Sequence, residues 1–145
     1  MAHCWLFIDL DGFQPINDGY GHAIGDGVLA AVARRLASTV RHGDAVSRFG
    51  GDEFLVLCAD LSDERDAVTA ADRIREAVSR PIEVDGHTVS VGCSIGIALY
   101  DERAGDAATL IHQADLAMYR AKQAGKGQVQ QYEPADDTAV GPIVA

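Results

Sequence analysis

The order of strand-like and helix-like segments leaves this chain few possible folds. A continuous apolar run over residues 4–8 is typical of a strand buried on both faces. Apolar residues with helical spacing follow over 26–40, with Asp26 as a possible N-terminal cap. Two more strand-like runs, 45–49 and 54–59, are separated by a short glycine-containing segment, and this spacing predicts a hairpin.

A second helix and a second long strand follow the hairpin. Ser62 or Asp63 can cap the helix, whose apolar stripe stops before Pro81. Apolar and small residues alternate over 89–98, which predicts a strand with one face of small side chains. A turn at residues 85–86 precedes it.

One further helix and strand complete the pattern. The helix covers residues 110–121 and is closed by Gly125, and residues 128–132 can add a strand. Strand, helix, hairpin, helix and strand together predict an α+β domain with a ferredoxin-like βαββαβ core and an extra C-terminal helix and strand. We expect this domain over 1–133, and a flexible tail or the start of a linker over 134–145.

Composition narrows the classes of partner. The 145 residues suit one domain, and the formal net charge of −10 argues against DNA, RNA or an anionic membrane as a direct partner. No apolar run is long enough to span a membrane, so membrane association would come only from flanking domains outside this sequence. Three cysteines without paired spacing predict buried free thiols and a cytoplasmic location.

The predicted topology brings distant acidic residues together. A right-handed crossover places the second hairpin strand beside the first strand, so the end of the first strand meets the hairpin turn. Asp9 and Asp11 lie at that strand end, and Asp52 and Glu53 lie at that turn. Carboxylates at this density favour Mg²⁺ or Mn²⁺. A solvated acidic rim without a metal explains the same residues.

Gly50 and Gly51 form the turn itself. Glycine permits a tight turn, or the close approach of a ligand where a side chain would clash. Because paired glycines are also common in ordinary hairpins, the pair alone does not decide between these interpretations.

The heptad at 48–54, RFGGDEF, resembles the signature of the GGDEF domain, the diguanylate cyclase family. Similar stretches follow the family's order: FIDLDGF, INDGYGHAIGD, a Ser-Ile-Gly strand and ADLAMYRAK. The resemblance extends over about residues 4–132. It implies an adenylyl-cyclase-like palm that joins two GTP molecules into cyclic di-GMP, releases two pyrophosphates, and works as a dimer of facing domains.

The resemblance also implies roles for the acidic residues. Asp9, the Leu10 carbonyl and Asp52 match the family's Mg²⁺ or Mn²⁺ ligands. Asp52 also matches the group that assists deprotonation of the attacking 3′-hydroxyl, and Glu53 is the second acidic residue of the catalytic turn.

The remaining substrate contacts are implied in the same way. The matching positions are Asn17 and Asp26 for guanine, and Gln14, Gly50, Gly51, Lys122 and Lys126 for the rest of GTP. Without the resemblance, Asp26 is a helix cap, Asn17 is a turn residue, and the lysines are surface residues at a helix C-terminus. The four-residue spacing of the lysines predicts that they share one helix face.

Arg41 and Asp44 match the family's Arg-x-x-Asp inhibitory site, which binds cyclic di-GMP. An Arg fork can hold a phosphate or a guanine edge, and a carboxylate can accept from guanine N–H groups. The alternative for this pair is a local surface ion pair.

Three departures from the family pattern bear on activity. Gln14 replaces the usual Lys, Lys126 replaces the usual Arg, and the family's preceding helix is absent, so we expect a fragment of a longer chain. The Gln-Tyr-Glu-Pro sequence at 131–134 resembles the end of GGDEF domains that are joined to a downstream phosphodiesterase domain of the EAL family. The alternative to an active cyclase is a regulatory module that binds GTP or cyclic di-GMP without catalysis.

Overall fold

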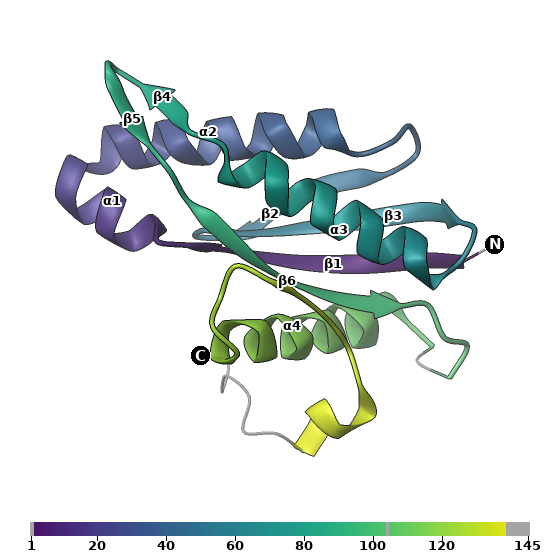
Figure 1. Cartoon of the computed structure of the whole chain (residues 1–145). Helices are drawn as coiled ribbons and strands as arrows, with labels where there is room; N and C mark the ends of the chain where they lie inside the picture. The colour runs from purple at the N-terminus through teal and green to yellow at the C-terminus, as the bar shows by residue number, and fades with distance from the viewer. Residues whose placement is uncertain (1, 104, 139–145) are drawn as a thin grey trace.

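The computed structural model describes residues 2–103 and 105–138, which form a sheet with helices on both faces (Figure 1). The strands are β1 (Ala2–Asp11), β2 (Ala45–Gly50), β3 (Glu53–Leu61), β4 (Ile82–Val84), β5 (His87–Val89), β6 (Gly92–Leu99) and β7 (Val129–Gln131). The helices are α1 (Phe13–Tyr20), α2 (His22–Thr39), α3 (Glu64–Ser79) and α4 (Ala107–Gln123), followed by a short 3₁₀ helix, η1 (Pro134–Thr138).

β1 lies at the centre of the five-stranded sheet. The strand order is β2-β3-β1-β6-β7, with β1 antiparallel to both β3 and β6 and with β7 parallel to β6. This order confirms the predicted ferredoxin-like α+β core and its additional C-terminal helix and strand. The predicted hairpin and the final strand are also confirmed.

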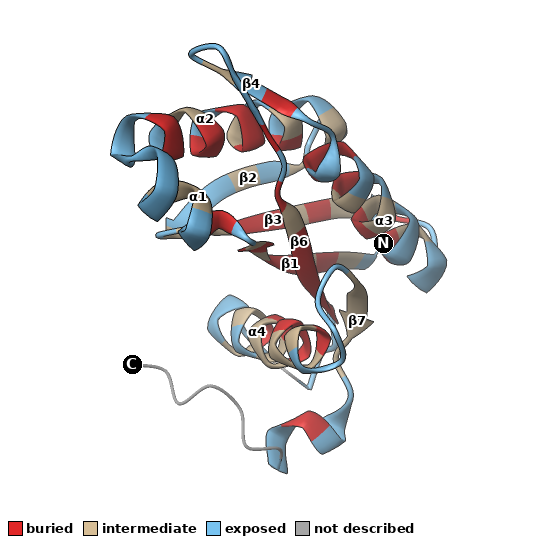
Figure 2. Ribbon diagram, turned by 60° about the vertical axis from the view of Figure 1, so that its left-hand side comes forward, coloured by how far each residue is buried: buried red, intermediate tan, exposed pale blue. Residues whose placement is uncertain are grey.

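The sheet divides the core into two layers, with α2 and α3 over one face and α4 over the other (Figure 2). Leu6, Ile8 and Leu10 face the larger layer, which includes apolar residues of α2 and α3. Phe7 faces the smaller layer, where it packs with α4 residues such as Met118. Burial on both faces explains why the sequence of β1 is almost continuously apolar.

The small-residue face of β6 lets α4 approach the sheet closely. A Cβ atom added at Gly96 would overlap the Ala114 carbonyl oxygen and the Met118 backbone nitrogen. The alternation over 89–98 therefore marks a strand that is buried on both faces. It does not mark one continuous strand, because β5 pairs with β4 in a separate hairpin and only β6 pairs with β1.

Helix α1 and the start of α2 differ from the sequence prediction. α1 has only eight residues, so its apolar pattern is too brief to predict a helix. Its Pro15 is tolerated because it lies near the start of the helix. α2 begins at His22 with Gly21 as its N-cap residue, five residues earlier than the cap predicted at Asp26. Asp26 is therefore an exposed residue within α2 and not a cap. The predicted cap at Asp63 is confirmed by hydrogen bonds to Arg65 and Asp66.

A short 3₁₀ helix, η1, lies at the start of the stretch expected to be a tail or linker. Asp136 of η1 is buried and its carboxylate lies 3.0 Å from Arg120 of α4. Residues 139–145 lie outside the described part of the chain. The three cysteines are free and buried as predicted. Among the described residues, no helix has the length and apolar character needed to cross a membrane.

We predict that Gly96→Ala lowers the free energy of unfolding by about 2–3 kcal/mol, because the added methyl pushes α4 away from the sheet. Urea unfolding followed by circular dichroism measures this loss. Gly19→Ala is the matched control, since Gly19 lies in α1 with open space around it and Ala favours a helix. Equal stability of the two variants would contradict the close α4–β6 packing.

Candidate functional site

The register between β1 and β3 brings the end of β1 against the hairpin turn. Asp9 is paired with Glu53, and the Leu10 N–H donates to the Asp52 carbonyl oxygen at 3.1 Å. Residues more than forty positions apart in the chain are thus neighbours across two hydrogen-bonded strands. This contact confirms that the topology joins the strand end to the turn.

A lysine from α4 lies among the oxygen atoms at this strand end. The Lys122 Nζ atom is 3.1 Å from Asp9 Oδ1 and 2.8 Å from Asp11 Oδ1. It also donates to the Leu10 carbonyl oxygen at 3.2 Å. Within the described residues, no three His, Cys, Asp or Glu side chains gather as a ready-made metal cluster. Oxygen atoms of three consecutive residues, Asp9, Leu10 and Asp11, surround one ammonium group, and Asp52 and Glu53 lie on the adjoining turn.

The Lys122 ammonium offsets the cost of burying the carboxylates around it. Burial raises the pKa of the Asp9 carboxyl, Asp52 and Asp11 add to the rise, and Lys122 opposes it. Burial also raises the pKa of Glu53, with a further contribution from Asp9. Burial by itself would lower the pKa of Lys122, but its ion pairs with Asp11 and Asp9 outweigh burial and raise that pKa. The pocket thus favours a bound positive charge.

The oxygen atoms that contact Lys122 also suit a divalent metal. Asp9 Oδ1 and the Leu10 carbonyl oxygen already converge on a single cation position, next to the turn that carries Asp52. Carboxylate and carbonyl oxygens are the ligands that Mg²⁺ and Mn²⁺ prefer. These residues therefore fit such an ion.

Asp11 organises the site, and the sequence did not reveal this role. Its carboxylate accepts from Ser94 Oγ at 3.0 Å and from the Gly127 N–H at 2.9 Å, in addition to its ion pair with Lys122. The Gly127 contact holds the turn that carries Lys126. The spacing of Lys122 and Lys126 predicted that they share a helix face, and this is wrong because α4 ends at Gln123. Asp11 nevertheless contacts both segments, through Lys122 itself and through the Gly127 N–H beside Lys126.

Asn17 lies where α1 packs on α2, against the glycine that precedes Asp26 in the chain. The Asn17 amide lies against Gly25, where any Cβ atom would overlap Asn17 Oδ1. The Asn17 Nδ2 atom lies 3.3 Å from His22 Nδ1. Glycine at position 25 therefore leaves room for the Asn17 side chain against α2.

The other predicted substrate residues are exposed or lie at the turn. Gln14 is exposed on α1 and donates to Asp18 Oδ1 at 2.9 Å. Neither Gly50 nor Gly51 has a left-handed backbone conformation, so the turn does not itself demand glycine. No protein atom lies within 4 Å of a Cβ built at Gly51. Its missing side chain thus leaves room beside the turn.

Comparison with known proteins decides the family. The family model described as "Diguanylate cyclase, GGDEF domain" matches residues 2–128. The chain belongs to the GGDEF domain family. Its fold accordingly matches a solved GGDEF domain of TpbB from Pseudomonas aeruginosa with a TM-score of 0.90, at 46% identity over 94% of this chain and 80% of that one.

Curated GGDEF relatives are much longer proteins. Diguanylate cyclase TpbB from Pseudomonas aeruginosa is 50% identical over 123 residues, which are 84% of this chain and 28% of the relative. The bifunctional diguanylate cyclase/cyclic di-GMP phosphodiesterase MucR, from the same species, is 45% identical over 83% of this chain and 18% of its own length. This chain therefore spans less than a third of either relative.

One further solved GGDEF domain contains a ligand. The GGDEF domain of DgcB from Caulobacter crescentus, in complex with c-di-GMP, matches with a TM-score of 0.80 at 25% identity, covering 90% of this chain and 77% of that chain.

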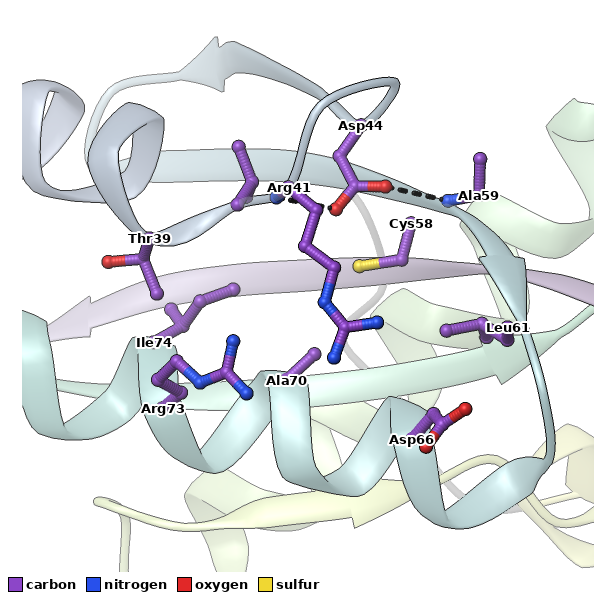
Figure 3. Close-up of a pocket in the computed structure, with 11 residues that line it drawn as sticks. Thr39, Arg41, Asp44, Cys58, Ala59, Leu61, Asp66, Ala70, Arg73 and Ile74 are labelled. Atoms are coloured by element: carbon purple, nitrogen blue, oxygen red, sulfur yellow. Dashed lines mark hydrogen bonds between the residues drawn. The ribbon is translucent and has the colours of Figure 1, made fainter.

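Arg41 and Asp44 of this GGDEF domain line a second pocket, between the entry to β2 and α3 (Figure 3). Asp44 accepts from the Arg41 backbone N–H at 3.0 Å and from the Ala59 N–H at 2.8 Å. The Arg41 guanidinium points into the pocket, and Arg73 of α3 approaches from the opposite wall. Arg73 could not be predicted from the sequence, because nothing in its local pattern distinguishes it from the other arginines on α3.

We predict that Asp44→Ala lowers the free energy of unfolding by about 1–3 kcal/mol, because two backbone N–H groups lose their acceptor. Thermal or urea unfolding measures the change. His42→Ala, in the same exposed loop, should stay within about 0.5 kcal/mol of the parent. If Asp44→Ala is as stable as His42→Ala, these hydrogen bonds do not hold the loop.

Proposed function

We propose that this GGDEF domain is a diguanylate cyclase that condenses two GTP molecules into cyclic di-GMP. The observation that carries the proposal is the convergence of Asp9 and the Leu10 carbonyl on one cation position beside the Asp52 turn. The 50% identical relative named as a diguanylate cyclase supports the same reaction. A cytoplasmic location, where GTP is available, fits this function.

Asp9, the Leu10 carbonyl and Asp52 would hold Mg²⁺ or Mn²⁺. When bound, such an ion neutralises charge on the triphosphate and supports phosphoryl transfer. Asp52 assists removal of the proton from the attacking 3′-hydroxyl, and Glu53 adds a second acidic group to the turn. Burial and the nearby Asp9 carboxylate raise the pKa of Glu53, which favours its protonated form more than in an exposed glutamate.

The nucleotide is held at both of its ends. Asn17 and Asp26 offer an amide and a carboxylate to the guanine edge. Lys122 and Lys126 offer two cations to the phosphates, since Asp11 at the end of β1 pairs with Lys122 and accepts from the Gly127 N–H next to Lys126. The space beside Gly51 allows a substrate to lie close to the turn. Because Gln14 is neutral, the phosphates have one cation fewer near them than in the usual family pattern.

Two domains are needed because each site is suited to one GTP. In a facing homodimer, the 3′-hydroxyl of each GTP attacks the α-phosphate of the other. Each attack forms one phosphodiester bond and releases one pyrophosphate, so two attacks close the ring. The domain without such a partner would bind nucleotide and make no product.

Incubation with GTP and Mg²⁺, followed by chromatography of the nucleotides, tests the reaction. We expect cyclic di-GMP from the parent and a loss of at least about 100-fold in rate for Asp52→Asn. Asp60→Asn, the same change at an exposed residue of β3, should keep the parent rate. GTP binding without any product from the parent would favour the regulatory alternative instead.

The second pocket is proposed as a product-inhibition site. Arg41 and Arg73 supply positive charge from opposite walls, and Asp44 keeps acceptor capacity for guanine beyond its two backbone contacts. The relative DgcB, whose GGDEF domain was solved with c-di-GMP, supports binding of this product. A product molecule held here by two domains would keep their substrate sites apart.

Arg41→Ala should weaken cyclic di-GMP binding by at least about tenfold, because the guanidinium supplies charge-assisted hydrogen bonds. GTP binding should not change. Calorimetry with each nucleotide measures both effects, and Arg34→Ala on the exposed face of α2 is the control. Parent-like binding of cyclic di-GMP by Arg41→Ala would reject the pocket as the product site.

A further inference from the structure

Lys122 occupies the position at which the metal ligands converge. Its ammonium contacts Asp9 Oδ1 and the Leu10 carbonyl oxygen, which are two of the three proposed metal ligands. It is also paired with Asp11 at 2.8 Å. A divalent ion and this ammonium therefore compete for the same oxygen atoms.

We propose that Lys122 is a resident counter-ion that excludes divalent metal from the nucleotide-free site, so that metal enters only together with GTP. The inference rests on the proposed function and adds an order of binding to it. Lys122 thereby has two successive partners: the carboxylates before substrate arrives, and the phosphates afterwards.

Charge and burial explain the exclusion. The side chains of Asp9, Asp11 and Lys122 are only 20%, 12% and 22% exposed, so water screens their charges weakly. A divalent ion placed beside the ammonium would face a like charge at short range. Since Lys122 already compensates Asp9, the free metal gains little that the lysine does not supply.

A triphosphate changes this balance. It brings anionic oxygens that attract both the metal and the ammonium, so the two cations no longer compete for one set of ligands. Lys122 lies near the C-terminal end of α4, and its long side chain can turn while it remains close to Asp11. Ser94 and the Gly127 N–H hold Asp11 in place, which gives the lysine a fixed anchor.

Positive coupling between metal and nucleotide follows. The metal binds weakly alone and strongly with GTP, and the nucleotide gains from the metal by the same factor. Removing the ammonium should have opposite effects on the two ligands: tighter metal binding without nucleotide, and weaker nucleotide binding.

Manganese titration monitored by electron paramagnetic resonance tests the proposal on the folded domain. Without nucleotide, Lys122→Met should bind Mn²⁺ at least about tenfold more tightly than the parent. Arg34→Met is the control, because Arg34 is an exposed cation on α2 with no ion pair to Asp9 among the described contacts, and it should match the parent. Addition of a non-hydrolysable GTP analogue should increase Mn²⁺ affinity strongly in the parent and at least tenfold less in Lys122→Met.

A second variant keeps the test decisive if Lys122→Met does not fold. Lys122→Gln lacks the charge but keeps an amide that can donate to Leu10 or Asp11, and it should show the same gain in Mn²⁺ affinity. Parent-like Mn²⁺ affinity in both folded Lys122 variants, with cyclic di-GMP still made by the parent, overturns this inference alone. Absence of Mn²⁺ binding by the parent even with the GTP analogue overturns the proposed metal site as well.

Discussion

The antiparallel register of β1 and β3 is the constraint on which the site depends. A shift of one residue would turn Asp9 and Asp11 into the apolar layer beneath α2 and α3, and would turn Leu10 out of it. Burial of alternate apolar residues along β1 makes such a shift costly. The hydrophobic core therefore fixes which carboxylates meet the hairpin turn, although none of its side chains takes part in the chemistry.

Packing on the opposite face supplies the positive charge. The close approach of α4 at Gly96 sets the helix against β6 and β1, and Lys122 near the end of that helix then reaches the end of β1. Asp11 links this helix, β6 and the following turn through its hydrogen bonds. Anions from the strands and cations from the helix end are thus positioned by two independent packing layers, which the central strand joins.

The sequence predicted the features that depend on local pattern. Periodicity gave the strands and most helices, and the order of elements placed Asp9 beside the hairpin turn. It could not predict the position of the Lys122 ammonium, which contacts Leu10 across 112 residues, or the Asp11–Ser94 bond across 83. Asp26 was misplaced as a cap because α1 and α2 meet at glycines without a strong start signal, and local pattern says nothing of the tertiary contact between Asn17 and Gly25.

We propose that the end of β1 and the hairpin turn together bind a metal–nucleotide complex. A crystal structure of the domain with Mn²⁺ and a non-hydrolysable GTP analogue, with manganese located by its anomalous signal, tests it most directly. We expect manganese bonded to the Asp9 carboxylate, the Leu10 carbonyl and Asp52, with the Lys122 ammonium on a phosphate. Manganese held by the nucleotide alone, with Lys122 still paired to Asp9, would contradict it.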